Sequence, residues 1–227
     1  MTIPLIDKYD FFEIVLAQVG AILAAETIAQ QALAVTAGED STLWAFDTYI
    51  DRYNPYEEFQ NDADATPIVN IWYDNSNFPK GKSQSVGRMV SSTSYNIDIY
   101  AAAASEDDPA GGYLRGDEES AKNLHRIIRL VRNILMHPDN QYLQLTQAVG
   151  TRTQNLIFSR WIDSIQVFQP QIDDRPVAGV IAGRCSLSVE FNELPVTETY
   201  NPLETVYATA KRAEDGKIIF EAQFETT

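Results

Sequence analysis

The stretch DEESAKNLHRIIRLVRNILMHP, residues 117–138, has the clearest structural pattern in the chain. It opens with Asp117, Glu118 and Glu119, at the end of a helix where the macrodipole favours anions, and it stops at Pro138. Between these limits the apolar residues recur at the 3.6-residue spacing of a helix that is buried along one face. These residues are Leu124, Ile127, Ile128, Val131, Ile134 and Leu135.

A second long helix is predicted near the N-terminus. Asp10, with Glu13 three residues later, has the spacing of a capping box, and Gly38 suits a helix C-cap. A shorter helix is expected after Asp40, so that helices occupy residues 10–55. The apolar residues expected to face the core from the long helix are Phe12, Val15, Val19, Ile22, Leu23, Ala29 and Leu33.

Four stretches between residues 66 and 193 have strand character. Residues 67–73 are apolar on both faces, which is typical of a central strand. Residues 95–100 alternate and predict a strand with one buried face. Residues 156–168 and 181–191 are further strands, and in the last of these Cys185 falls on the apolar side. The expected fold is α+β, an antiparallel sheet covered by two long helices.

The C-terminal part has a different character. We expect one domain over residues 1–193, with helices at 10–55 and the sheet with its helix at 66–193. Residues 194–227 then form a C-terminal extended arm and a short strand. The arm is rich in Pro and Thr up to Tyr207, and the strand has an apolar side formed by Ile218, Phe220, Ala222 and Phe224.

Composition and charge exclude several classes of function. With 17 Lys+Arg against 32 Asp+Glu the chain has a formal charge of −15, so it repels nucleic acids and acidic membranes. One cysteine, Cys185, rules out an intrachain disulfide and a thiolate metal cluster. The N-terminus lacks a basic signal-peptide region, and we expect a soluble protein made inside the cell. The first helix is apolar, but it contains residues that are costly in hydrocarbon: Glu13, Gln18, Glu26, Gln30 and Gln31.

No catalytic, cofactor or metal residues are predicted. His137 is explained by the favourable position of a cation at a helix C-terminus. The acidic pairs in predicted loops match no calcium-loop spacing, and solvated carboxylates are the simpler interpretation. The basic residues of the second helix are either a solvated helix face or a docking surface for an acidic neighbouring subunit. The residues concerned are Lys122, Arg126, Arg129 and Arg132.

The chain resembles the tail terminator proteins of tailed bacteriophages, which are related to tail-completion and neck proteins. The residues that carry the resemblance lie between Thr66 and Leu194. They are Thr66–Tyr73, Ser94–Tyr100, the helix Ala121–His137, and the strand pair Ile157–Phe168 and Gly179–Glu193.

This resemblance implies a structural virion protein that is made in the host cytoplasm. It implies a homo-oligomeric ring, expected to be a hexamer, that caps the tail tube and joins it to the head connector. The implied partners are other copies of the chain, the tail tube protein and the connector or neck protein. DNA is only passing cargo, and no membrane or cofactor is involved.

On this view the subunit interface comprises the four basic residues of the second helix together with Ile218, Phe220 and Phe224. Acidic loops are the candidates to face the channel, where negative charge repels passing DNA. These candidates are Glu106, Asp107, Asp108, Asp173 and Asp174.

Three other functions stay open at this point. The chain could be a different virion part, such as a tail tube, connector or baseplate protein. It could be an enzyme such as a metal-dependent hydrolase, or a monomeric interaction module.

Overall fold

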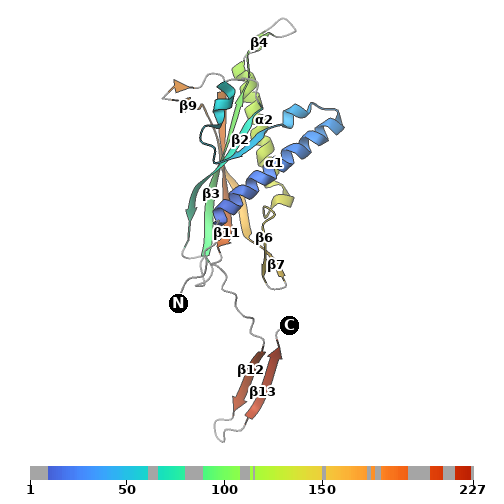
Figure 1. The fold of residues 1–227 in the computed structure, drawn as a ribbon, viewed down its shortest axis with the longest axis vertical. Helices are drawn as coiled ribbons and strands as arrows, with labels where there is room; N and C mark the ends of the chain where they lie inside the picture. Colours follow the sequence, from blue (N-terminus) through green and yellow to red (C-terminus); the bar gives the residue numbers. More distant parts are fainter. Residues whose placement is uncertain are drawn as a thin grey trace. The chain divides into compact units, whose positions relative to one another are not determined.

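The computed structural model describes residues 10–60, 66–79, 89–107, 113–114, 116–149, 152–172, 175–176, 180–193, 205–211 and 218–225. Figure 1 shows the arrangement of the elements. The helices are α1 (Phe11–Ala37) and α2 (Gly116–Met136), with short 3₁₀ turns η1 (Ser41–Trp44), η2 (Pro55–Gln60) and η3 (Pro138–Asn140).

The fold is a mixed α+β structure with a five-stranded sheet and two long helices. The strand order in the sheet is β1-β2-β3-β11-β8. Its strands are β1 (Asp47–Ile50), β2 (Ile68–Asn77), β3 (Met89–Ala102), β8 (Ile157–Phe168) and β11 (Val180–Glu193). Short two-stranded pairs are formed by β4 (Glu106–Asp107) with β5 (Tyr113–Leu114), β6 (Thr146–Val149) with β7 (Arg152–Asn155), and β9 (Gln171–Ile172) with β10 (Arg175–Pro176).

The prediction of a wholly antiparallel sheet is wrong at β1. This strand runs parallel to β2, from the pair Asp47↔Ile68 to the pair Ile50↔Ile71, whereas the other neighbours are antiparallel. Residues 47–50 were expected in a helix, and only the turn η1 has helical character there. Thr48, Tyr49 and Ile50 are residues that favour strands, and pairing with β2 satisfies their backbone groups.

Helix α1 has the predicted caps. The Asp10 side chain accepts a hydrogen bond from the backbone N–H of the first turn, and the Glu13 side chain accepts one from the backbone N–H of Asp10. At the other end, Gly38 has a left-handed backbone conformation with φ 75°. The N-terminal half of the predicted core face is correct, since Val15 and Leu23 are buried. The C-terminal half is wrong, because Leu33 is 61% exposed.

Helix α2 confirms the predicted apolar stripe, and all six of its residues are buried. It packs on β3 and β11, whereas α1 packs on β1 and β2. Gly183 in β11 allows the close approach of α2, because a Cβ there would lie 2.7 Å from Ile128 Cδ1.

Strand β3 differs from its prediction, because both of its faces are buried. Ile97 and Ile99 belong to the main core together with side chains of α1 and α2. On the opposite face Asn96 and Asp98 are 6% and 4% exposed. Tyr100, two residues after Asp98, belongs to a second apolar cluster that also includes Phe59 of η2. Alternation therefore located the strand but not the burial of its polar side.

The C-terminal strands form a hairpin that is a unit separate from Lys8–Glu193. Strand β12 (Thr205–Lys211) pairs antiparallel with β13 (Ile218–Glu225). Residues 205–207, expected at the end of the arm, thus belong to a strand, and the rest of the arm up to residue 204 lies outside the described residues.

We predict that Gly116→Ala destabilises the fold by about 1–3 kcal/mol, the usual cost of overpacking. A Cβ at Gly116 would lie 2.5 Å from the Ala103 carbonyl oxygen, a backbone atom that cannot rotate away. Urea unfolding followed by circular dichroism measures the effect. The control is Asn133→Ala at an exposed position of the same helix, which should lose no stability, and equal midpoints for the two variants would contradict the prediction.

Candidate functional site

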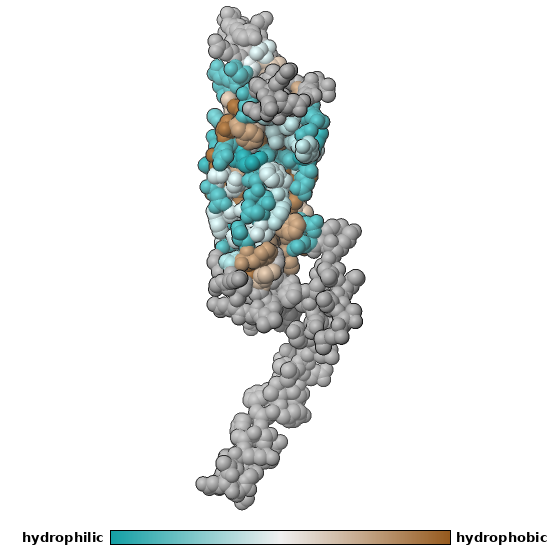
Figure 2. All heavy atoms as spheres, turned by 90° about the vertical axis from the view of Figure 1, so that its left-hand side faces the viewer, coloured by the Kyte–Doolittle hydropathy of each residue, from teal (hydrophilic) through white to brown (hydrophobic). Residues whose placement is uncertain are grey.

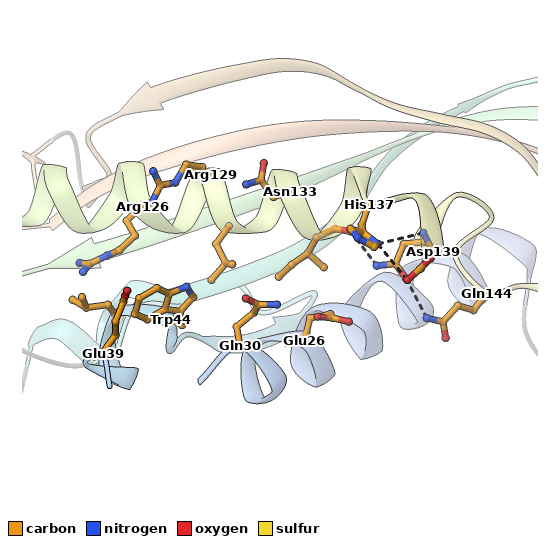
Figure 3. A pocket seen from close by; sticks show the side chains of 14 residues that line it. Glu26, Gln30, Glu39, Trp44, Arg126, Arg129, Asn133, His137, Asp139 and Gln144 are labelled. Atoms are coloured by element: carbon orange, nitrogen blue, oxygen red, sulfur yellow. Dashed lines mark hydrogen bonds and ion pairs between the residues drawn. The ribbon is translucent and has the colours of Figure 1, made fainter. Parts of the chain in front are cut away.

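A groove of about 880 Å³ lies between α2 on one side and α1 with η1 on the other. Figure 3 shows Arg126, Arg129, Asn133 and His137 along the α2 wall. The opposite wall carries Glu26, Gln30, Glu39 and Trp44, and the end is closed by Asp139 and Gln144.

The turn η1 is held against α1 by local hydrogen bonds. The Thr27 hydroxyl donates to the Trp44 carbonyl at 2.7 Å. Asp40 caps the turn, accepting from the Thr42 backbone at 3.0 Å and from the Thr42 hydroxyl at 2.8 Å. These two bonds, the side-chain bond first, lower the pKa of Asp40. The groove wall that carries Trp44 is therefore fixed by the sequence that follows α1.

The far end of the groove is fixed by Arg160 of β8. Its Nε donates to the Asn140 carbonyl at 2.6 Å and its Nη2 to the His137 carbonyl at 2.7 Å. Burial lowers the pKa of Arg160. The sequence analysis missed this residue, because it lies 20 positions or more from the carbonyl groups that it binds and carries no local signal.

His137 directly follows the last residue of α2 and is also the N-cap of η3. Its Nδ1 accepts from the Asp139 backbone at 3.3 Å and caps η3. Asn140 Nδ2 donates back to the Ile134 carbonyl at 3.0 Å. In the structure, Arg160 supplies a positive charge to the carbonyls that follow α2.

The four basic residues of α2 have different surroundings. Lys122 pairs with Glu118 at 3.1 Å and with Glu119 at 3.5 Å on its own helix, and hydrogen bonding to Glu118 raises its pKa. Arg126 and Arg129 line the groove, and Arg132 is exposed outside it. Among the residues that the structure describes, none of these three arginines forms an ion pair.

The groove is lined by both signs of charge. Arg126 and Arg129 lie on the wall opposite Glu26 and Glu39 (Figure 3). The Nε of Arg126 is buried without a hydrogen-bond partner in the described part of the chain. A groove with this lining can bind a molecular surface that carries hydrogen-bonding groups and charges of both signs.

A polar cluster crosses the sheet on the face opposite the main core. Arg184 binds Asp98 through two bonds, Nε to Oδ1 at 2.7 Å and Nη2 to Oδ2 at 2.9 Å, and this pairing raises the pKa of Arg184. Trp72 Nε1 also donates to Asp98 at 3.0 Å, and the guanidinium lies 4.9 Å from the Trp72 ring centroid. The side away from the helices is mostly hydrophilic, with hydrophobic residues toward its ends (Figure 2).

The remaining predicted site residues are not brought together by described contacts. Glu106 and Asp107 lie in β4, and Ile218, Phe220 and Phe224 lie in β13, but their side chains are outside the description. Asp108, Asp173 and Asp174 lie outside the described residues altogether. No group of three His, Cys, Asp or Glu side chains able to hold a metal ion occurs within the described ranges.

Comparison of the chain with family models and with curated protein sequences finds no match.

Cys185 is fully buried, as predicted, and burial raises its pKa to about 11. Only about one thiol in a thousand would therefore be ionised at pH 8. We predict that Ellman's reagent labels Cys185 at pH 8 only as fast as the protein unfolds, and that urea exposes one thiol per chain. Rapid labelling of the folded protein would contradict this prediction.

Proposed function

We propose that this chain is a structural virion protein, a phage tail terminator that forms a homo-oligomeric ring. In this proposal the ring caps the tail tube and joins it to the head connector. The two long helices form a covering layer on one sheet face, and the C-terminal segment acts as an arm. The sequence resemblance over residues 66–194 supports this assignment, and it is also the basis for expecting six subunits.

The observation that carries the self-association is a set of three arginines on α2 that form no ion pair with any residue the structure describes. The chain has a formal charge of −15, yet Arg126, Arg129 and Arg132 have no ion-pair partner among the described residues. An acidic surface of another copy is the complement of this cationic face. Contact between two different surfaces of identical subunits closes into a ring when the rotation between neighbours permits it.

The net charge also suits a channel for DNA. Phosphate binding depends on Lys and Arg, so a lumen lined by carboxylates lets a duplex pass without adhering. The acidic residues Glu106, Asp107, Asp108, Asp173 and Asp174 remain the candidates for that lining. Electron microscopy of the purified protein tests the proposal: closed rings support a terminator, long tubes indicate a tail tube protein, and single particles of monomer size overturn it.

We predict that the triple variant Arg126→Glu/Arg129→Glu/Arg132→Glu assembles more weakly while its monomer stays folded. Surface ion pairs contribute about 0–1 kcal/mol each, so the loss of three pairs weakens association by up to about a hundredfold. Analytical ultracentrifugation measures the assembly and circular dichroism the fold.

The matched control for this variant is Lys122→Glu, a charge reversal on the same helix. Lys122 is already paired with Glu118 and Glu119, so its reversal should weaken the helix slightly and leave assembly unchanged. If the triple variant assembles like the unmodified protein, the arginine face is a solvated surface and not an interface.

A further inference from the structure

Helix α1 carries an outer stripe of apolar residues on the side that faces away from its own core. The buried residues of the helix include Val15, Val19 and Leu23. The outer stripe runs along the opposite side at spacings of three and four residues, and all of its residues are exposed. It consists of Ile14, Ala17, Ala21, Ala25, Ile28, Ala32 and Val35.

The outer stripe contains no charged residue, and its large side chains are the most exposed. Ile28 is 68% exposed and Val35 is 65% exposed. By length and composition alone α1 could span a membrane, although part of it is buried in the core. An apolar stripe on a helix is normally buried against another element, so a further element is expected on this side of α1.

The C-terminal hairpin has an apolar face of its own. Its register forms three pairs of apolar residues, which are Val206↔Phe224, Ala208↔Ala222 and Ala210↔Phe220. Residues paired across two strands, and alternate residues along one strand, share a face, so these six residues form the apolar face of the hairpin. A hairpin of two strands is marginally stable by itself in water, and this face also needs a cover.

The outer stripe and the apolar face of the hairpin have complementary patterns of residue size. Along the stripe the large residue Ile28 lies between Ala25 and Ala32, at about 4.5 Å and 6 Å along the helix axis. Along β13 the small residue Ala222 lies between two phenylalanines, at steps of about 7 Å, and its partner across the hairpin, Ala208, is equally small. The order small, large, small therefore meets the order large, small, large at similar spacing.

The chain is long enough for the hairpin to reach another copy. The hairpin belongs to a unit separate from Lys8–Glu193, the unit that contains α1. Residues 194–204 connect β11 to β12, and a segment of this length can span up to about 40 Å. A contact between the two uncharged surfaces would also bury no carboxylate, which matters in a chain of charge −15.

We propose that the apolar face of the hairpin of one copy packs on the outer stripe of α1 in a second copy of this chain. In this contact Ile28 packs above the pair Ala208↔Ala222. The inference rests on the proposed ring and identifies the surface of the neighbouring subunit that receives the C-terminal arm. Because the two surfaces differ, the contact is head-to-tail, and each copy uses both. Pairing of two α1 helices, or binding of α1 to lipid, would leave the hairpin face uncovered.

A charged substitution tests the stripe. Ile28→Asp should raise the concentration at which the assembly dissociates by at least about tenfold, because a carboxylate would be buried in an apolar contact. Analytical ultracentrifugation measures the assembly and circular dichroism the fold. The matched control is Leu33→Asp, because Leu33 is 61% exposed on the same helix but lies about 140° around the axis from Ile28. Equal assembly of the two variants overturns the proposal.

A compensating pair of substitutions tests the match in size. Ala222→Leu should weaken assembly because it fills the space that Ile28 occupies, and Ile28→Ala should weaken it because buried apolar area is lost. The double variant should associate more tightly than Ala222→Leu alone, since the second change makes room for the first. Additive weakening, the result for residues that do not touch, overturns the proposal.

Cross-linking identifies the occupant. Ile28→Cys and Ala222→Cys proteins are oxidised separately and as a mixture, while buried Cys185 stays reduced. A covalent dimer that forms only in the mixture supports the proposal. A dimer of either protein alone overturns it, as does the absence of any dimer or a cross-link that forms only within single chains carrying both cysteines. Sedimentation of the unmodified protein, but not of Ile28→Asp, with phosphatidylcholine/phosphatidylglycerol vesicles also overturns it.

Failure of this contact is distinguishable from failure of the proposed function. Rings of the unmodified protein that persist in Ile28→Asp would refute the contact and leave the terminator ring standing. Cross-linking in the mixture without rings in electron microscopy would keep the contact and refute the ring.

Discussion

The antiparallel ladder between β3 and β11 is the constraint on which the rest of the structure depends. Both strands are 14 residues long and pair from Val180↔Ala102 to Glu193↔Met89. One face of the ladder supports α2 through Gly183, and the other holds the Arg184–Asp98 pair. Because this ladder fixes α2, it also fixes one wall of the groove that α2 shares with α1 and η1.

The surface features follow from how the two helices occupy one sheet. With α1 over β1 and β2 and α2 over β3 and β11, Ile165 and Val167 in the C-terminal part of β8 are left partly exposed, whereas Ile157 at its start is buried in the core. The same arrangement turns the arginines of α2 toward the groove and the solvent. Polar and apolar surfaces are thus both left exposed in a chain whose net charge would otherwise keep copies apart, and we interpret the arginines of α2 and the outer stripe of α1 as surfaces for assembly.

Local patterns predicted the elements well where burial is one-sided. The stripe of α2, the caps of α1 and the strands β8 and β11 were all recognised from periodicity and end signals. The misses required tertiary information: β1 forms because β2 is available as its partner, and Asp98 is buried because Arg184, 86 residues later, neutralises it. The contacts of Arg160, and the groove whose end it fixes, were also missed. Arg160 binds carbonyl groups 20 and 23 residues earlier in the chain, and no local sequence pattern predicts a contact over that separation.

The central claim is that identical chains close into a ring through unlike surfaces. Native mass spectrometry of the 227-residue chain over a range of concentrations tests this most directly. The account predicts one dominant species that contains six copies of the 25.4 kDa chain, with its stoichiometry independent of concentration once assembled. A 25.4 kDa monomer at every concentration would contradict the account.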